Sequence, residues 1–202
     1  MRRSKLVRDA NGWKTLSSER QFGNSHLEVV TEKVQTPSSP QARVWTTVRR
    51  KAAVVIAPVT KEGEILLIKE ERIPIRAVIW SMPAGQIDSE VEPDEAAIET
   101  VALRELHEET GYDLAPGGEL IPLGYFFTSP GLTDEHCYLF LARPVQLADL
   151  HNREEGEAIL DCRAVTTDQL SRMIAQNEIR DSNTLAICAR LAARGFISLA
   201  PR

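Results

Sequence analysis

Three glutamates stand within five positions of one short segment, and their spacing is typical of a metal site. Residues 104–111 read RELHEETG. In a helix, Glu105 and Glu109 lie one above the other and Glu108 lies beside them. Clustered carboxylates repel one another unless a cation neutralises them, and oxygen ligands favour a hard ion such as Mg²⁺ or Mn²⁺. The segment therefore predicts a divalent metal site, although a solvent-exposed, glutamate-rich helix would show the same spacing.

The residues before this cluster indicate where it lies in the protein. Ile98, Val101 and Ala102 precede the carboxylates on the same helical face. That face changes from apolar to acidic along the helix, so the carboxylates should lie at the edge of the core. Arg104 stands one turn before Glu108, and an ion pair between them would orient the cluster.

Hydrophobic periodicity predicts the elements that must position the cluster. A helix should begin near Pro93 and end at Gly111, since proline favours the first turn of a helix and glycine its C-terminal cap. Further strands are predicted over residues 26–34, 43–50, 52–59, 65–68, 120–127, 137–142 and 158–165, and further helices over residues 167–176 and 182–194. These elements predict an α+β fold, an α/β sandwich with a mixed β-sheet flanked by helices.

The N-terminal part of the chain differs from the rest in its organisation. The first shift in composition falls at residues 35–40, a turn-rich stretch that is expected to separate an N-terminal appendage from the main domain. We predict that residues 1–50 form a β-rich N-terminal extension and that residues 51–202 form the main domain.

Composition argues against several classes of partner. The 202 residues suffice for a core that needs no disulfide or structural metal. Their net charge of −5 argues against nucleic acid as a partner, and no run of about 18 apolar residues is present to cross a membrane. Cys137, Cys162 and Cys188 are odd in number and far apart, so we expect reduced thiols in a cytoplasmic protein.

The glutamate cluster forms part of a longer motif that starts at Gly85. Residues 104–112, together with this glycine, resemble the signature of Nudix hydrolases, an upstream glycine and then Arg-Glu-apolar-x-Glu-Glu-x-Gly-apolar. In a predicted turn, the glycine lets the backbone approach a ligand or metal closely, with a simple loop glycine as the alternative. Gly85 and Arg104 are nineteen positions apart, more than is usual in the family. The isolated upstream glutamate of the signature stays open among Glu90, Glu92, Glu95 and Glu99.

The resemblance extends beyond this motif. Four more segments, taken in order, are similar to the ADP-ribose pyrophosphatase branch of the family: residues 13–18, 69–72, 83–88 and 129–135. This implies a Nudix fold and an enzyme that uses Mg²⁺, with Mn²⁺ as a substitute, to hydrolyse ADP-ribose or a similar nucleoside diphosphate sugar to AMP and ribose 5-phosphate. Two departures from the branch leave the substrate open. Position 81 is serine, where many relatives have glutamate, and the turn at residues 115–118 is longer. The alternatives are a hydrolase of GDP-mannose or NADH and a non-catalytic nucleotide-sensing module.

The resemblance also implies a set of metal ligands and an assembly. Glu105 and Glu109, with the backbone carbonyl of Ala84, would hold one or more Mg²⁺ ions against the pyrophosphate, and Glu108 would share a bridging ion. Because the branch is commonly a homodimer, the N-terminal extension would serve both dimerisation and adenine binding.

The catalytic base is expected in the acidic loop before the strand at residues 158–165. Members of the branch carry a catalytic glutamate in the corresponding loop. Glu157 is favoured because it directly precedes the strand, and Glu155 is the second candidate. An ordinary solvated loop is the alternative for either residue.

Three further residues are candidates for substrate binding. Arg72 suits phosphate or the terminal ribose, since a guanidinium makes paired hydrogen bonds, and an ion pair with Glu70 or Glu71 is the alternative. Ser129 and Glu135 would offer a hydroxyl and a carboxylate to a sugar from the loop at residues 128–135.

Overall fold

The computed structural model describes residues 6–88, 93–149 and 158–199. Its strands are β1 (Lys14–Gly23), β2 (Leu27–Thr36), β3 (Ser39–Arg50), β4 (Ala53–Thr60), β5 (Ile65–Arg72), β6 (Ala77–Ser81), β7 (Ala84–Gln86), β8 (Tyr112–Phe127), β9 (His136–Leu147) and β10 (Ile159–Val165). The helices are α1 (Glu95–Thr110), α2 (Thr167–Ala175) and α3 (Ser182–Ala193), with a short 3₁₀ turn, η1 (Ile73–Ile75), between β5 and β6.

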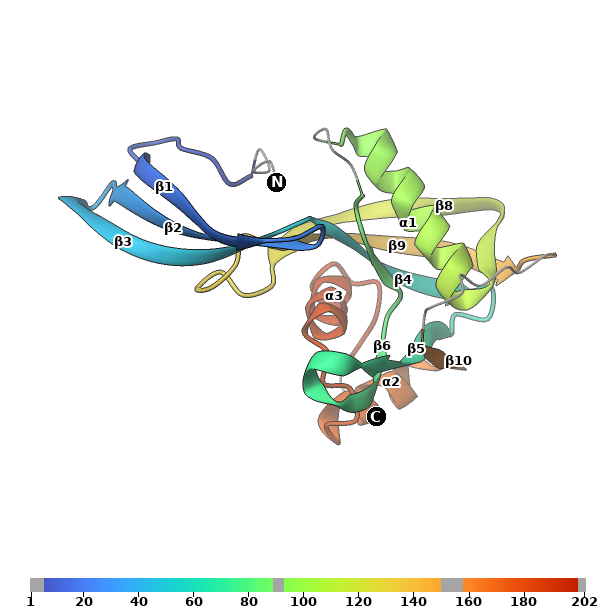
Figure 1. The fold of residues 1–202 in the computed structure, drawn as a ribbon. Helices are drawn as coiled ribbons and strands as arrows, with labels where there is room; N and C mark the ends of the chain where they lie inside the picture. Colours follow the sequence, from blue (N-terminus) through green and yellow to red (C-terminus); the bar gives the residue numbers. More distant parts are fainter. Residues whose placement is uncertain (1–5, 89–92, 150–157, 200–202) are drawn as a thin grey trace.

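The N-terminal strands form a sheet of their own. Within the described residues, β1, β2 and β3 pair in that order, each antiparallel to its neighbour. This sheet extends to one side of the rest of the molecule (Figure 1). The turn-rich stretch at residues 35–40 holds the end of β2, the turn at residues 37–38 and the start of β3, so it lies inside this sheet. Sequence patterning missed β1, because residues 14–23 are polar or solvent-exposed over most of their length and show no alternation.

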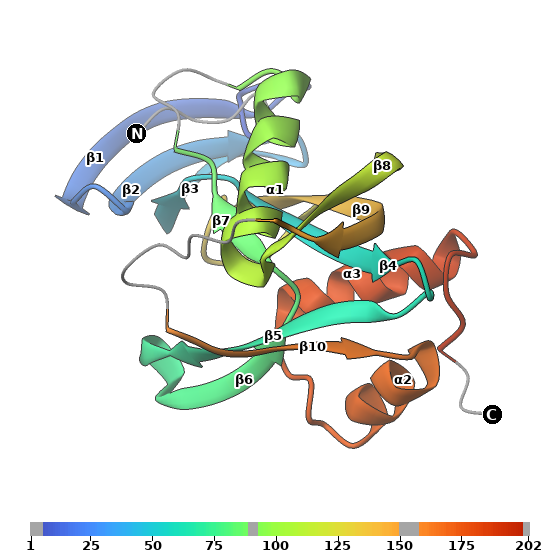
Figure 2. The ribbon, with the colours of Figure 1, turned by 90° about the vertical axis from the view of Figure 1, so that its right-hand side faces the viewer.

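The main sheet is mixed, as the sequence predicts. In the described ranges its order is β10-β5-β4-β9-β8, with β6 added to β5 and β7 added to β4. β4 and β9 are parallel, whereas the other pairs are antiparallel. Figure 2 shows β10, β5 and β6 side by side at one end of the molecule.

Helices cover both faces of this sheet and form two apolar layers. β4 is buried on both sides, so its alternate residues contribute to different layers. One layer joins β4 and β5 to α1 through Val54, Ile56, Leu66, Ile98, Ala102 and Leu106. The other joins the opposite face to α2 and α3 through Val55, Leu67, Leu170, Ile187 and Leu191. The α/β sandwich predicted from the sequence is therefore confirmed (Figure 1).

Two segments expected as turns are parts of strands. Residues 115–118 lie inside β8, where the register against β9 shifts between Leu114 and Glu119. This irregularity takes up the extra residues without ending the strand. Gly85 belongs to β7 and pairs with Val54 of β4, so the backbone at this position is held on one edge by a neighbouring strand.

The cysteines are free, and two of them are deeply buried. Burial raises the pKa of the Cys137 and Cys188 thiols to about 12, with the Glu135 carboxylate adding to the effect at Cys137. Both side chains therefore stay neutral and act as small apolar core residues. In the part of the chain described here, no helix combines the length and apolar character that crossing a membrane requires.

The start of α3 is tied to the chain segment that leads into β7. Asp181 caps the helix by accepting hydrogen bonds from the backbone N–H and hydroxyl of Thr184, at 2.7 and 2.8 Å. The Thr184 hydroxyl oxygen in turn accepts the backbone N–H of Met82 at 2.8 Å. Met82 and Thr184 are buried, and an interior N–H without a partner is costly. The position of Ala84 therefore depends on a helix far away in the sequence.

Thr184→Val should lower the free energy of unfolding by about 2 kcal/mol, because the buried Met82 N–H and the Asp181 carboxylate both lose a partner. Urea denaturation followed by circular dichroism measures this change. Thr184→Ser, which keeps the hydroxyl, is the matched control and should recover most of the loss. Equal stability of the valine variant and wild type would contradict this role of the hydroxyl.

Candidate active site

Helix α1 presents the glutamate cluster as its sequence predicts. Asp94 caps the N-terminus by accepting the backbone N–H of Ala97 at 2.9 Å, and Gly111 ends the helix in the left-handed conformation at φ 76°. Between these caps, Glu105 and Glu109 are each only 5% exposed. They continue the apolar face of the helix, so two carboxylates lie at the core edge rather than in solvent.

Arg104 holds two carboxylates of α1 at once. Its guanidinium forms ion pairs with Glu105 and with Glu108, the latter at 2.5 Å. The pair with Glu108 has the i,i+4 spacing expected from the sequence. Arg104 thus offsets part of the negative charge of the cluster and limits the rotamers of both glutamates.

Strand β7 brings the backbone against these carboxylates. The Ala84 N–H donates a hydrogen bond to Glu109 Oε2 at 2.8 Å. At Gly85, a side-chain carbon would overlap the carboxylate of Glu105. The backbone angle at Gly85 is ordinary, so the glycine is required for space rather than for conformation.

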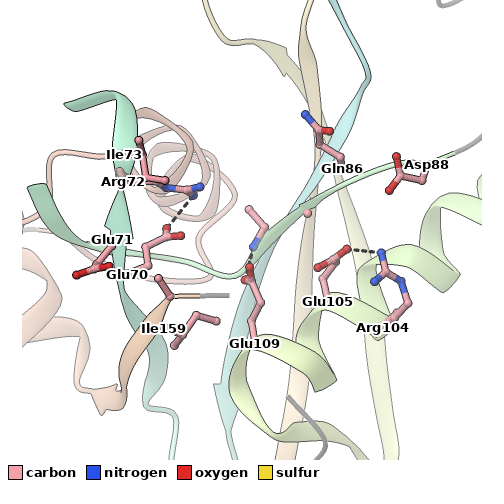
Figure 3. A pocket seen from close by; sticks show the side chains of 13 residues that line it. Glu70, Glu71, Arg72, Ile73, Gln86, Asp88, Arg104, Glu105, Glu109 and Ile159 are labelled. Atoms are coloured by element: carbon pink, nitrogen blue, oxygen red, sulfur yellow. Dashed lines mark hydrogen bonds and ion pairs between the residues drawn. The ribbon is translucent and has the colours of Figure 1, made fainter. Parts of the chain in front are cut away.

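A pocket of about 430 Å³ opens between α1, β7 and the end of β5. Its lining includes Glu70, Glu71, Arg72, Ile73, Ala84, Gly85, Gln86, Asp88, Arg104, Glu105, Glu109, Ala158 and Ile159. Figure 3 shows Glu105 and Glu109 on α1, Glu70 and Arg72 at the end of β5, and Ile159 at the start of β10 around this space. Five carboxylates and two guanidinium groups lie in this wall, so its formal charge is negative.

The lining residues fit a divalent cation. Glu105 and Glu109 supply oxygen atoms, the ligands that hard ions prefer. The Ala84 N–H points toward Glu109 and away from β4. In a strand, the N–H and C=O groups of one residue point to the same side, so the Ala84 carbonyl also points away from β4, toward the edge that faces α1. Within the described ranges, no three Asp, Glu, His or Cys side chains converge as a complete metal site.

The end of β5 contributes a residue that the sequence analysis considered only as an ion-pair partner. Glu70 is 7% exposed, accepts the hydroxyl of Ser81 at 2.5 Å and forms an ion pair with Arg72 at 2.7 Å. Arg72 therefore lines the pocket while paired with Glu70, the alternative that the sequence left open. The alternation of side chains along a strand could have indicated that Glu70 faces the interior. Leu66, Ile68 and Glu70 share one face of β5, and Leu66 and Ile68 are buried.

Other predicted site residues lie elsewhere. Glu108 pairs with Arg104 and is not among the lining residues. Ser129 and Glu135 lie in the loop before β9, away from this pocket lining. Glu135 forms an ion pair with Arg50 at 3.1 Å and accepts the Thr128 hydroxyl at 2.8 Å, which ties the loop to β3.

The remaining acidic candidates fall mostly outside the described residues. This applies to both base candidates, Glu155 and Glu157, and to Glu90 and Glu92. Of the other candidates for the upstream glutamate, Glu95 and Glu99 are exposed on α1 and do not line the pocket. The residue that directly follows Glu157, Ala158, does line it.

Comparison with known proteins places this geometry in a family. The NUDIX domain model matches residues 48–186. An ADP-ribose pyrophosphatase of Bacillus subtilis (strain 168) is 30% identical over 171 residues, covering 85% of this chain and 88% of the relative. A methanol dehydrogenase activator of Bacillus methanolicus is 29% identical over 172 residues, with 85% and 88% coverage.

A solved structure supports the same fold. The crystal structure of an ADP compounds hydrolase superposes with a TM-score of 0.72, covering 95% of this chain and 100% of that one, at 17% identity. An identity this low shows the fold alone. Nudix hydrolases generally use divalent metal cations, in agreement with the oxygen-lined pocket. The chain belongs to the Nudix hydrolase family.

Proposed function

We propose that this protein hydrolyses the pyrophosphate bond of ADP-ribose, or of a similar nucleoside diphosphate sugar, giving AMP and ribose 5-phosphate with Mg²⁺ or Mn²⁺. The observation that carries the proposal is the placement of Glu105 and Glu109 against the backbone of β7 in one pocket. The relative from Bacillus subtilis named ADP-ribose pyrophosphatase supports the choice of substrate, since its match covers 85% of this chain.

The charge of the pocket explains why a cation is needed. Five carboxylates against two guanidinium groups would repel a diphosphate. Glu105, Glu109 and the Ala84 carbonyl would hold one or more ions, with Glu108 sharing a bridging ion. When bound, such ions offset the charge of the phosphates and acidify a water molecule.

The chain's own residues would orient and activate the reactants. Glu157 would take a proton from the attacking water as general base, and Glu155 is the second candidate. Support for this role comes from Ala158 and Ile159, which follow in sequence and line the pocket. Arg72, on the same wall as Glu70, would bind phosphate or the terminal ribose.

Contacts to the rest of the substrate would come from outside this pocket. Ser129 and Glu135 belong to a loop that lies against β3, where the Trp45 indole N–H donates to the Gly131 carbonyl at 3.2 Å. We propose that this region binds the part of the substrate beyond the diphosphate. The free thiols support a reducing, cytoplasmic setting.

The N-terminal sheet supports a homodimer. Its strands and the residue just before them expose large apolar side chains, namely Trp13, Leu16, Phe22, Val44 and Trp45. Exposed apolar groups of this size on one small sheet favour contact with another protein surface. We propose that the partner is a second copy of this chain, with residues 1–50 at the interface.

The full chain should elute and scatter light with the mass of two chains at micromolar concentration. Size-exclusion chromatography coupled to light scattering measures the mass directly. Replacing both Phe22 and Val44 by serine should shift the distribution toward one chain, because both exposed side chains lose apolar area. A single-chain mass for the unaltered protein would refute the homodimer.

With Mg²⁺, the protein should release AMP from ADP-ribose, and Glu109→Gln should reduce turnover by at least about a hundredfold because an ion ligand loses its charge. Products are separated by chromatography. Glu119→Gln, an exposed change on β8, is the charge-matched control. Parallel reactions with GDP-mannose and NADH identify the preferred substrate, and tight ADP-ribose binding without any turnover would instead indicate a sensor.

Glu157→Gln should lower kcat at least about tenfold with little change in KM, since a general base acts on the chemical step rather than on binding. Steady-state kinetics on ADP-ribose measure both constants. Glu155→Gln is the neighbouring control. If kcat falls only in the Glu155 variant, the base is Glu155, and if it falls in neither, the base lies outside this loop.

A further inference from the structure

A hydrogen-bonded series links buried Ser81 through Glu70 to Arg72 at the pocket wall. Oε1 of Glu70 accepts the Ser81 hydroxyl at 2.5 Å and also meets an Nη atom of Arg72 at 2.7 Å. Glu70 and Ser81 are 7% and 1% exposed, whereas the Arg72 side chain is 42% exposed. The series therefore runs from the interior to the pocket wall, as Figure 3 shows for its Glu70 and Arg72 end.

Sheet register brings the three residues onto one face. Ser81 of β6 stands opposite Ile68 of β5, so Glu70 is its diagonal neighbour two residues along. Arg72 follows Glu70 by two positions and shares its side of the strand. The contacts thus follow from the pairing of β5 with β6 and do not depend on a loop.

Burial explains why Glu70 needs both partners. A carboxylate removed from water is destabilising unless charge and hydrogen bonds compensate it. Arg72 supplies the charge and Ser81 supplies the second donor. Replacing either partner removes one of the two interactions that hold the carboxylate in place.

Arg72 needs a fixed partner because its side chain is long and partly exposed, whereas Glu70 needs one because it is buried. Arg72 is the last residue of β5, pairs with Ala77 of β6 and precedes the 3₁₀ turn η1, so the sheet holds its backbone while its side chain remains 42% exposed. Ordering a free arginine side chain costs up to about 2 kcal/mol of rotamer entropy. One ion pair with Glu70 leaves other N–H groups of the guanidinium available to a ligand.

We propose that Glu70 is a positioning residue that holds the Arg72 guanidinium in the pocket to bind diphosphate oxygens, with Ser81 holding Glu70. The inference rests on the proposed function, in which the pocket takes a diphosphate. Glu70 would strengthen binding of the substrate in its ground state, because it acts through Arg72 and not on the attacking water.

The test measures binding of inorganic pyrophosphate with Mg²⁺ by calorimetry, beside kcat and KM for ADP-ribose. Glu70→Ala should weaken pyrophosphate binding and raise KM at least about tenfold, with kcat within about threefold of wild type. Glu70→Gln should stay within about threefold in both constants, since an amide oxygen still accepts from Arg72 and Ser81. Glu62→Ala, in an exposed turn, is the control for loss of one charge.

A double-mutant cycle separates positioning from a general structural effect. In an Arg72→Ala background, adding Glu70→Ala should cause no further loss of binding, because its effect passes through the guanidinium. Mn²⁺ affinity, followed by electron paramagnetic resonance, should be the same in Glu70→Ala and wild type. If Glu70→Ala does not fold, Ser81→Ala replaces it in the same cycle, with a loss of about threefold expected.

Each outcome bears on one proposal or the other. Wild-type binding by Glu70→Ala, an additive loss in the Arg72→Ala background, or a fall in Mn²⁺ affinity would overturn the positioning role. Absence of pyrophosphate binding by the wild type would overturn it as well. The remaining outcome separates the two proposals. If the wild type binds pyrophosphate and the double-mutant cycle gives the expected result, but no substrate is hydrolysed, the positioning role stands and the proposed function is refuted.

Discussion

The close contact between β7 and α1 is the constraint on which the rest of the site depends. It requires a residue without a side chain at Gly85 and a backbone N–H directed at Glu109. Two carboxylates can then lie at the core edge with polar partners on one side and the pocket on the other. Pairing of β7 with β4 and the link from Thr184 to Met82 hold this contact from two directions.

Much of α1 could be predicted from the sequence because its signals are local. Proline and aspartate before the helix, glycine after it and an apolar face that turns acidic all lie within one segment. The same holds for the positions along the chain of most strands and of α2 and α3. Local patterns determine these elements, and the tertiary structure agrees with them.

Other features could not be predicted because they depend on contacts between distant segments. β1 has almost no buried residues, so only its pairing with β2 defines it. The partner of Glu70 depends on the register of β6, and a single sequence does not contain that register. Residues 115–118 look like a turn by composition, yet β9 holds them in a strand across an irregularity.

The Ser81 hydroxyl restricts how this protein can diverge from its relatives. At this position the chain has a short donor facing the buried carboxylate of Glu70. Two carboxylates on these neighbouring strand positions would repel each other in a poorly hydrated site. Positions 70 and 81 should therefore covary during evolution, with an acidic residue at one excluding an acidic residue at the other.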